Sequence, residues 1–199
     1  SNASNFLNIG GGGNNDTLTG DDNANVIIGA GGNDTLNGGG GNDTIYGGYG
    51  GDILDGGNGF DAIYGSRGSD YIVGMAGSDN IFAGQGADTI LGSSGADTLR
   101  GGGGPNKIDA GEEDGVQDLI YIFADVATND RPNDGSFMDL LENIEVDDKI
   151  YILGGEATDN LQFVDNGNFV DIYHNNAIEA RLLNTDLTSN QIANMTSFF

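Results

Sequence analysis

A nine-residue pattern repeats from residue 11 to residue 109 without a change of period, and this regularity constrains the fold more than any other feature of the chain. Eight strong copies run in order: GAGGNDTLN, GGGGNDTIY, GGYGGDILD, GGNGFDAIY, GSRGSDYIV, GMAGSDNIF, AGQGADTIL and GSSGADTLR. Looser copies flank them, GGGNNDTLT and GDDNANVII before and GGGGPNKID after, which makes eleven. The common pattern is GGxGxDxUx, where U is aliphatic. The place of a residue in the repeat therefore predicts its environment.

The repeat predicts a coiled β-structure with a thin aliphatic core. The first six residues of each copy lack bulk and are expected to turn the chain, whereas the last three are expected to be extended, with the aliphatic residue on one face. Two copies then make one coil of 18 residues, whose opposite strands point their aliphatic residues at each other. The expected fold is all-β: a right-handed parallel β-roll of two short-stranded parallel sheets. The aliphatic column is Leu18, Ile27, Leu36, Ile45, Leu54, Ile63, Ile72, Ile81, Ile90, Leu99 and Ile108.

The composition indicates a cation as the natural partner of the chain. The formal net charge is −25, with 31 acidic and six basic residues, so nucleic acid and anionic membrane surfaces are unsuitable partners. The 37 glycines would suggest disorder in another chain, but here they are periodic. There is no cysteine, which excludes disulfides and zinc-thiolate sites. No apolar stretch approaches the roughly 20 residues that span a bilayer.

The glycine-rich loops and their aspartates predict a series of calcium sites. Calcium takes six to eight oxygen ligands and accepts both carboxylates and backbone carbonyls. Because one coil contains two repeats, each loop lies beside the loop two repeats away. One expected ligand column is Asp16, Asp34, Asp52, Asp70, Asp88 and Asn106, and the other is Asn25, Asp43, Asp61, Asp79 and Asp97, continued by Asp118. We expect about seven to ten Ca²⁺ ions, with weak sites at the two asparagines. The alternative is that the aspartates only form Asx turns.

The outer face of alternate coils predicts a ladder of large side chains. The ninth places of these copies are Ile28, Tyr46, Tyr64, Phe82 and Arg100. We expect the first four to form a docking surface for the C-terminal segment or another domain, and the alternative is simple cross-strand stacking. The opposite ladder is mixed and is expected to face solvent. The sequence contains no HExxH, GxSxG or GxxxxGK[ST] motif, and its single histidine, His174, is expected to lie on the surface, so the chain is predicted not to be an enzyme.

Three segments are predicted: a tag remnant (SNA) and lead-in at 1–10, the roll at 11–118, and a β-rich C-terminal cap at 119–199. In the cap, strands are expected at 119–126, 149–153, 161–164, 169–173 and 178–183, the last three joined as hairpins by DNG and NN turns. Short helices are expected at 137–144 and 188–195, the second preceded by a capping box of Thr188 and Gln191.

The array resembles the RTX (repeats-in-toxin, hemolysin-type calcium-binding) family. The segment NIEVDDKIYIL at 143–153 and the aromatic C-terminus are similar to the end of serralysin-type secreted proteins. The resemblance implies a calcium-binding module of a secreted bacterial protein, exported by type I secretion machinery and folded by calcium outside the cell or at its surface. Two alternatives remain open. The chain is the end domain of an adhesin or surface-layer protein, or it is the non-catalytic tail of a protease or lipase that lies upstream.

Overall fold

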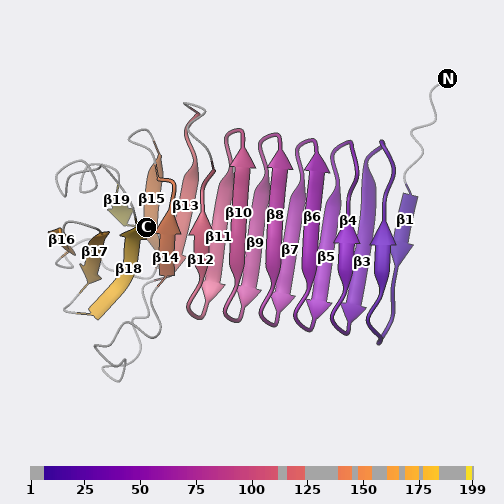
Figure 1. Ribbon diagram of the computed structural model, residues 1–199, viewed down its shortest axis with the longest axis horizontal. Helices are drawn as coiled ribbons and strands as arrows, with labels where there is room; N and C mark the ends of the chain where they lie inside the picture. The colour runs from indigo at the N-terminus through magenta and orange to yellow at the C-terminus, as the bar shows by residue number, and fades with distance from the viewer. Residues whose placement is uncertain are drawn as a thin grey trace.

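The computed structural model describes residues 7–111, 116–123, 139–144, 148–153, 161–165, 169–174, 177–183 and 196–198. All elements in these ranges are β-strands, which lie in two sheets that run side by side along the length of the molecule (Figure 1). From β1 to β15 the chain alternates between the sheets as it advances, so each pair of consecutive strands forms one coil. The predicted parallel β-roll is confirmed.

We call the nine-stranded sheet A and the ten-stranded sheet B. Sheet A contains, in spatial order, β1 (Leu7–Gly10), β3 (Asn25–Gly31), β5 (Thr44–Tyr49), β7 (Ala62–Arg67), β9 (Asn80–Gln85), β11 (Thr98–Gly103), β13 (Leu119–Phe123), β15 (Lys149–Leu153) and β19 (Thr196–Phe198). Sheet B contains β16 (Leu161–Asp165), β17 (Phe169–His174), β18 (Ala177–Leu183), β14 (Asp139–Glu142), β12 (Lys107–Asp109), β10 (Thr89–Ser94), β8 (Tyr71–Ala76), β6 (Ile53–Asn58), β4 (Thr35–Asn37) and β2 (Thr17–Thr19).

The register of the sheets confirms the 18-residue coil. In sheet A, Ile45 of β5 lies opposite Ile63 of β7, and in sheet B, Leu54 of β6 lies opposite Ile72 of β8. The pairing is parallel in both cases. Each residue therefore lies beside the residue in the same place two repeats later.

The strands of the central coils are longer than the sequence pattern predicts. Strands β5 to β11 each have six residues, because they include the last three places of one repeat and the first three of the next. Gly48, at a second place, pairs with Ser66 of the next coil, so the ladder does not stop at the ninth place. Only about three residues between strands then turn the chain. The expectation of a six-residue turn was wrong because glycine, despite its weak strand propensity, also supports close parallel pairing of backbones.

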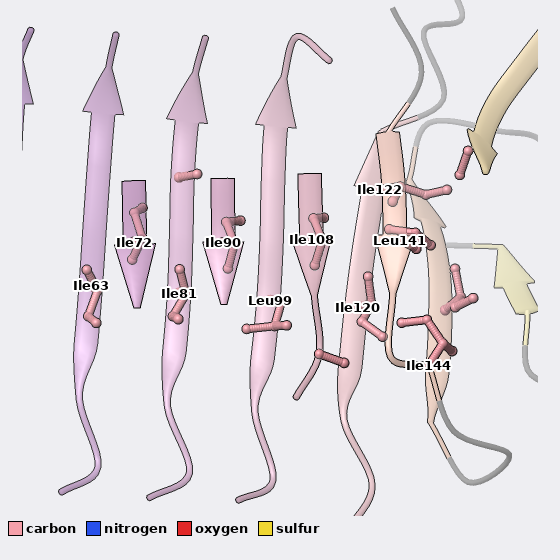
Figure 2. Packing of buried hydrophobic residues seen from close by; sticks show 14 of the residues in the cluster. Ile63, Ile72, Ile81, Ile90, Leu99, Ile108, Ile120, Ile122, Leu141 and Ile144 are labelled. Carbon is pink, nitrogen blue, oxygen red and sulfur yellow. The ribbon is translucent and has the colours of Figure 1, made fainter. Parts of the chain in front are cut away.

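The aliphatic column forms the core between the sheets. From Ile27 to Ile108 every member of the column is fully buried, whereas Leu18 at the first coil is only partly buried. Figure 2 shows the two rows, with Ile63, Ile81 and Leu99 from sheet A alternating with Ile72 and Ile90 from sheet B. Strand β1 also takes part, because its Ile9 pairs with Ile27 and packs against the core. This member was not predicted.

Backbone pairing continues beyond residue 109, where the nine-residue period ends. Strand β13 pairs in parallel with β11, and β14 pairs in parallel with β12. Ile120, Ile150 and Leu141 extend the core and are fully buried. Large aliphatic residues therefore continue the core of the roll in coils that lack the glycine pattern.

The structure confirms most of the predicted C-terminal strands and corrects one helix. Strands β16, β17 and β18 form the expected antiparallel hairpins. The helix expected at 137–144 is wrong, because β14 occupies Asp139–Glu142 and pairs with its neighbours on both sides. Helical periodicity in this short segment was outweighed by the burial of Leu141 between the sheets. The helix expected at 188–195 lies outside the described residues. No helix in the described ranges is long and apolar enough to cross a membrane.

Candidate metal centre

The tight turns between strands depend on left-handed backbone at the fourth place of the repeat. Gly68, for example, has φ of 132°, and a Cβ there would overlap the carbonyl oxygen of Gly50 one coil earlier. Both the backbone angle and the close approach of the neighbouring loop therefore require glycine. The second place is also left-handed, but there the chain accepts Ser66 and Met75. The two left-handed residues stack each loop directly on the loops of the adjacent coils.

The aspartates of the sixth place form a continuous ladder along each row of loops. One oxygen of each carboxylate, Oδ1, accepts the backbone N–H of the residue in the same place one coil earlier. Asp52 N–H donates to Asp70 Oδ1 at 2.8 Å, and Asp61 N–H donates to Asp79 Oδ1 at 2.8 Å. Because this bond joins two coils rather than closing a turn within one loop, it is not the Asx turn of the alternative reading.

The second oxygen, Oδ2, has no hydrogen-bond partner in the interior of the array. It is buried and unpaired in Asp34, Asp43, Asp52, Asp61, Asp70, Asp79 and Asp88, whose residues are 1% to 3% exposed. A buried carboxylate oxygen with no partner costs free energy unless a proton or a cation compensates it. Seven such oxygens lie in two rows, and each calls for a proton or a cation.

A backbone carbonyl accompanies six of these oxygens, those of Asp34, Asp43, Asp52, Asp61, Asp70 and Asp79. At the first glycine of a repeat, two oxygens lie close to the position that a Cβ would occupy. One is Oδ2 of the aspartate in the same repeat, and the other is the carbonyl oxygen of the first-place residue two repeats later. At the place where a Cβ of Gly56 would lie, Asp61 Oδ2 is 2.7 Å away and Gly74 O is 2.8 Å away. At Gly74 the corresponding distances are 2.5 Å to Asp79 Oδ2 and 2.8 Å to Gly92 O. A side chain at the first place would fill this cradle, so glycine keeps it open in these six repeats, whereas the repeat of Asp88 has Ala83 at this place.

The donor set fits calcium. In the described ranges, no group of three or more His, Cys, Asp or Glu side chains is placed to hold a metal ion. An ion between loops would thus be held by one or two carboxylates together with backbone carbonyls. This oxygen-only set is the one that Ca²⁺ prefers, and it lacks the nitrogen and sulfur ligands typical of zinc.

Burial makes the unpaired carboxylates reluctant to ionise in the absence of a cation. It raises the pKa of Asp61 to about 7, although the N–H of Asp43 opposes the shift, and the carboxylates of Asp79, Asp43 and Asp55 raise it further. Burial likewise raises the pKa of Asp70 and of Asp79 to about 6. A bound divalent cation would favour the charged form instead.

The remaining predicted ligands are placed in the same columns but lack the unpaired oxygen. Asp16 Oδ2 accepts the N–H of Gly12 at 2.8 Å. Asn25 Oδ1 accepts the N–H of Asp21 at 2.7 Å, and Asn106 Nδ2 donates to Gly104 O at 3.0 Å. Asp118 Oδ1 accepts the N–H of Asp97 at 2.7 Å. Asp16 and Asn25 begin the two ladders, whereas Asn106 and Asp118 continue them toward the C-terminal coils.

Two further aspartates join the columns and were not predicted. Asp139 Oδ1 accepts the N–H of Asn106 at 2.9 Å, and Asp148 Oδ1 accepts the N–H of Asp118 at 2.9 Å. Their signal is a short motif, Asp followed two residues later by an aliphatic residue, which occurs as DLI at 118–120, DLL at 139–141 and DKI at 148–150. The same triplet ends the regular repeats. It persists where the glycine spacing is lost.

A second side-chain ladder, also not predicted, links the fifth places of the loops. Asn33 Oδ1 accepts the N–H of Gly51 at 3.0 Å, and Asn42 Oδ1 accepts the N–H of Phe60 at 3.1 Å. Ser69 Oγ accepts the N–H of Ala87 at 3.2 Å. The ladder is interrupted where the fifth place has no oxygen-bearing side chain.

The predicted aromatic ladder lies on the outer face of sheet A. Tyr46 and Tyr64 stack with ring centroids 4.9 Å apart and planes 10° apart. Ile28 and Tyr46 remain 44% and 39% exposed. The predicted row continues beyond Arg100, whose guanidinium carbon lies 4.5 Å from the ring centroid of Tyr121. Cross-strand stacking is therefore present, and docking remains a prediction.

Comparison with known proteins agrees with these features. The family model of the RTX calcium-binding nonapeptide repeat (4 copies) matches residues 10–45, 29–63, 46–81, 73–108 and 91–114, which together cover more than half of the chain. No curated protein matches the chain. Among solved structures, the extracellular lipase LipA from Serratia marcescens aligns over 96% of this chain with 14% identity and a TM-score of 0.36. The chain spans 40% of the length of that lipase. By its repeats, the chain belongs to the RTX calcium-binding nonapeptide repeat family.

Proposed function

We propose that this calcium-binding RTX module is a calcium-dependent folding switch of a secreted bacterial protein. The observation that carries the proposal is the set of seven buried Oδ2 atoms without partners, six of which lie beside a backbone carbonyl at a first-place glycine. Asp34, Asp52, Asp70 and Asp88 would supply carboxylate ligands in one row of loops, and Asp43, Asp61, Asp79 and Asp97 in the other. Calcium bound there would neutralise the carboxylates and join neighbouring coils.

The energetic effect of the ions is large enough to decide whether the chain folds. With a Kd of about 10⁻⁴ M per site, calcium at about 1 mM would stabilise the folded state by about 1.4 kcal/mol per site. Eight such sites would contribute about 11 kcal/mol, which is comparable to the whole stability of an ordinary domain. At submicromolar calcium this contribution vanishes. The chain would remain unfolded in a calcium-poor cytosol and fold after export.

The export route and the final location follow from the same argument. An unfolded, acidic, cysteine-free chain suits passage through type I secretion machinery, with folding in extracellular calcium or at the cell surface. Any catalytic domain would lie upstream, as in a protease or lipase. The exposed aromatic row on sheet A supports a second candidate, an end domain of an adhesin or surface-layer protein that binds a partner.

A calcium titration of the apo chain tests the proposal. Circular dichroism should show an unfolded spectrum in a chelator and a cooperative gain of β-signal as calcium rises, with no such gain in magnesium. Isothermal titration calorimetry should count about eight ions per chain. The same β-spectrum and the same melting temperature with and without calcium would contradict the proposal.

A further inference from the structure

The outer face of sheet A differs in charge from the rest of this acidic chain. At the outward-facing seventh and ninth places of strands β3 to β15, there is no Asp or Glu. The face instead carries Arg100 and Lys149, and Arg67 lies near the end of β7. In a chain of net charge −25 this is a concentration of positive charge. We call this surface the sheet A face.

The aromatic row gives the sheet A face a flat apolar surface made of ring edges. Tyr46 and Tyr64 stack face to face, and Tyr121 and Tyr151 stack with centroids 4.8 Å apart. Because each ring covers the face of the next, few ring faces remain free for a sugar to stack on. The row presents edges and hydroxyl groups, which suit packing against another flat surface.

Sheet B carries a second exposed apolar surface on the opposite side of the roll. Ile53 is 51% exposed, Tyr71 is 44% exposed and Met75 is 43% exposed, while Val73 and Leu91 beside them are half-buried. Asp55, at the ninth place of β6, lies beside Val73 within this patch, and beyond the patch lie Lys107, which pairs with Glu142, and Asp109 at the end of β12. We call this surface the sheet B face.

The two faces match each other coil by coil. Tyr46 and Ile53 belong to one coil, Tyr64 and Tyr71 to the next, and Phe82 and Leu91 to the one after. In the following coil, Arg100 is on the sheet A face and Asp109 on the sheet B face. The apolar residues of the two faces thus fall in the same three coils, with Asp55, which accepts a hydrogen bond from Asn37, as the polar exception, and Arg100 has a carboxylate at the same level.

We propose that the sheet A face binds the sheet B face of a second copy of this chain. A simple translation perpendicular to the sheets places the aromatic row on the apolar patch and Arg100 opposite Asp109. Flat sheets pack face to face at about 10 Å, so this contact needs no rearrangement. The two surfaces differ, so the contact is heterologous and each bound copy leaves a free face at either end. Side-by-side rows of folded rolls result.

A charge exchange tests this contact in the folded, calcium-loaded chain. Light scattering should give the wild type a weight-average mass that rises with concentration, and Arg100→Glu and Asp109→Lys should each lower the assembled fraction at least tenfold. An equimolar mixture of the two variants should restore assembly, because each Glu then meets a Lys and each remaining Arg meets an Asp. Asp22→Lys changes the same charge in an exposed loop and should assemble like the wild type.

The outcomes separate this contact from calcium-driven folding. Circular dichroism in calcium checks that each variant folds, and if Arg100→Glu does not fold, Asp109→Lys with wild type still tests the sheet B face. A wild type that is monomeric at all concentrations overturns the proposal, as does a mixture that fails to restore assembly. A monomer that instead binds alginate or heparin beads through Arg100 also overturns it, in favour of an anionic polysaccharide.

Discussion

Asp61 illustrates how a single carboxylate serves two coils. Its Oδ1 accepts the N–H of Asp43, whereas its Oδ2 is buried beside Gly74 O. The hydrogen bond to Oδ1 needs only an acceptor oxygen. A cation at Oδ2 favours a negatively charged carboxylate, which the apo protein stabilises poorly. Replacing the carboxylate with an amide therefore has opposite effects in the two states.

We expect Asp61→Asn to stabilise the apo chain and to weaken calcium binding. The amide removes a buried charge whose pKa is raised to about 7, but it also removes the anionic ligand. Loss of one site corresponds to about 1.4 kcal/mol of calcium-linked stability at about 1 mM calcium. Melting curves with and without calcium measure both effects, and Asp22→Asn in an exposed loop is the control. An equal shift of the two curves would contradict this expectation.

The stability of the apo roll should depend on pH in the opposite sense to that of the calcium form. Burial raises the folded-state pKa values of Asp61, Asp70 and Asp79 to about 7, about 6 and about 6, above the ordinary aspartate value of 3.8. The folded apo state therefore binds more protons than the unfolded chain between about pH 4 and pH 7. This contribution is fully present below about pH 4 and is lost as the pH rises through 6 to 7.

Circular dichroism and thermal melts from about pH 8 down to about pH 5 measure this dependence. Without metal, the chain is expected to be unfolded near pH 8, and acidification should increase its folded fraction and the melting temperature of the folded form. In calcium it should fall, because protons compete with the ions for the same oxygens. A melting temperature that falls on acidification in both conditions would mean that the aspartates are ionised in the apo fold.

The strands and turns show which parts of the fold are predictable from the pattern. The nine-residue period was sufficient to predict the coil, the aliphatic column and the Asp columns, because each depends only on a residue's place in the repeat. It failed where the spacing changes, as at Asp139 and Asp148, whose loops differ in length from the regular ones. The strand at 139–142 was missed for the same reason, since its pairing depends on distant neighbours rather than on local sequence.

We expect the left-handed fourth place to tolerate substitution of its glycine less than any other position in a turn. Gly68→Ala combines positive φ, which costs about 1–2 kcal/mol in an L-residue, with overlap against Gly50 O. We expect destabilisation of at least about 3 kcal/mol and a higher calcium midpoint for folding. Gly103→Ala is the matched control, since a Cβ there has no atom within 4 Å. Equal midpoints for the two variants would refute the turn assignment.

The interrupted fifth-place ladder offers a stabilising substitution. Phe60 is 62% exposed and provides no acceptor for the N–H of Ser78 one coil later, in contrast to the Asn42 acceptor one coil earlier. Phe60→Asn should add one hydrogen bond between loops and about 0.5–1.5 kcal/mol of stability. Phe60→Ala removes the same ring without adding an acceptor. A melting temperature no higher for Phe60→Asn than for Phe60→Ala would argue against the ladder.

At the scale of the whole molecule, the roll is a linear stack in which each coil contacts only its neighbours. Its first coil is the least buried, since Ile9 and Leu18 are only partly covered while Ile63 and Ile72 are fully buried. Opening should therefore begin at the N-terminal end.

Hydrogen exchange in calcium should reveal this gradient. Amides of β2 should exchange faster than those of β6 and β8, and the difference should increase as calcium is lowered toward the folding midpoint. Uniform protection along the array would instead indicate that all coils open as one unit.

The constant register of 18 residues also makes the molecule extensible. Each inserted pair of repeats adds one strand to both sheets and lengthens the stack by about 4.8 Å, while leaving both ends as they were. Duplication or deletion of such a unit in a gene would change the distance between the two ends of the array in fixed increments. The length of the array is therefore set by the number of repeats.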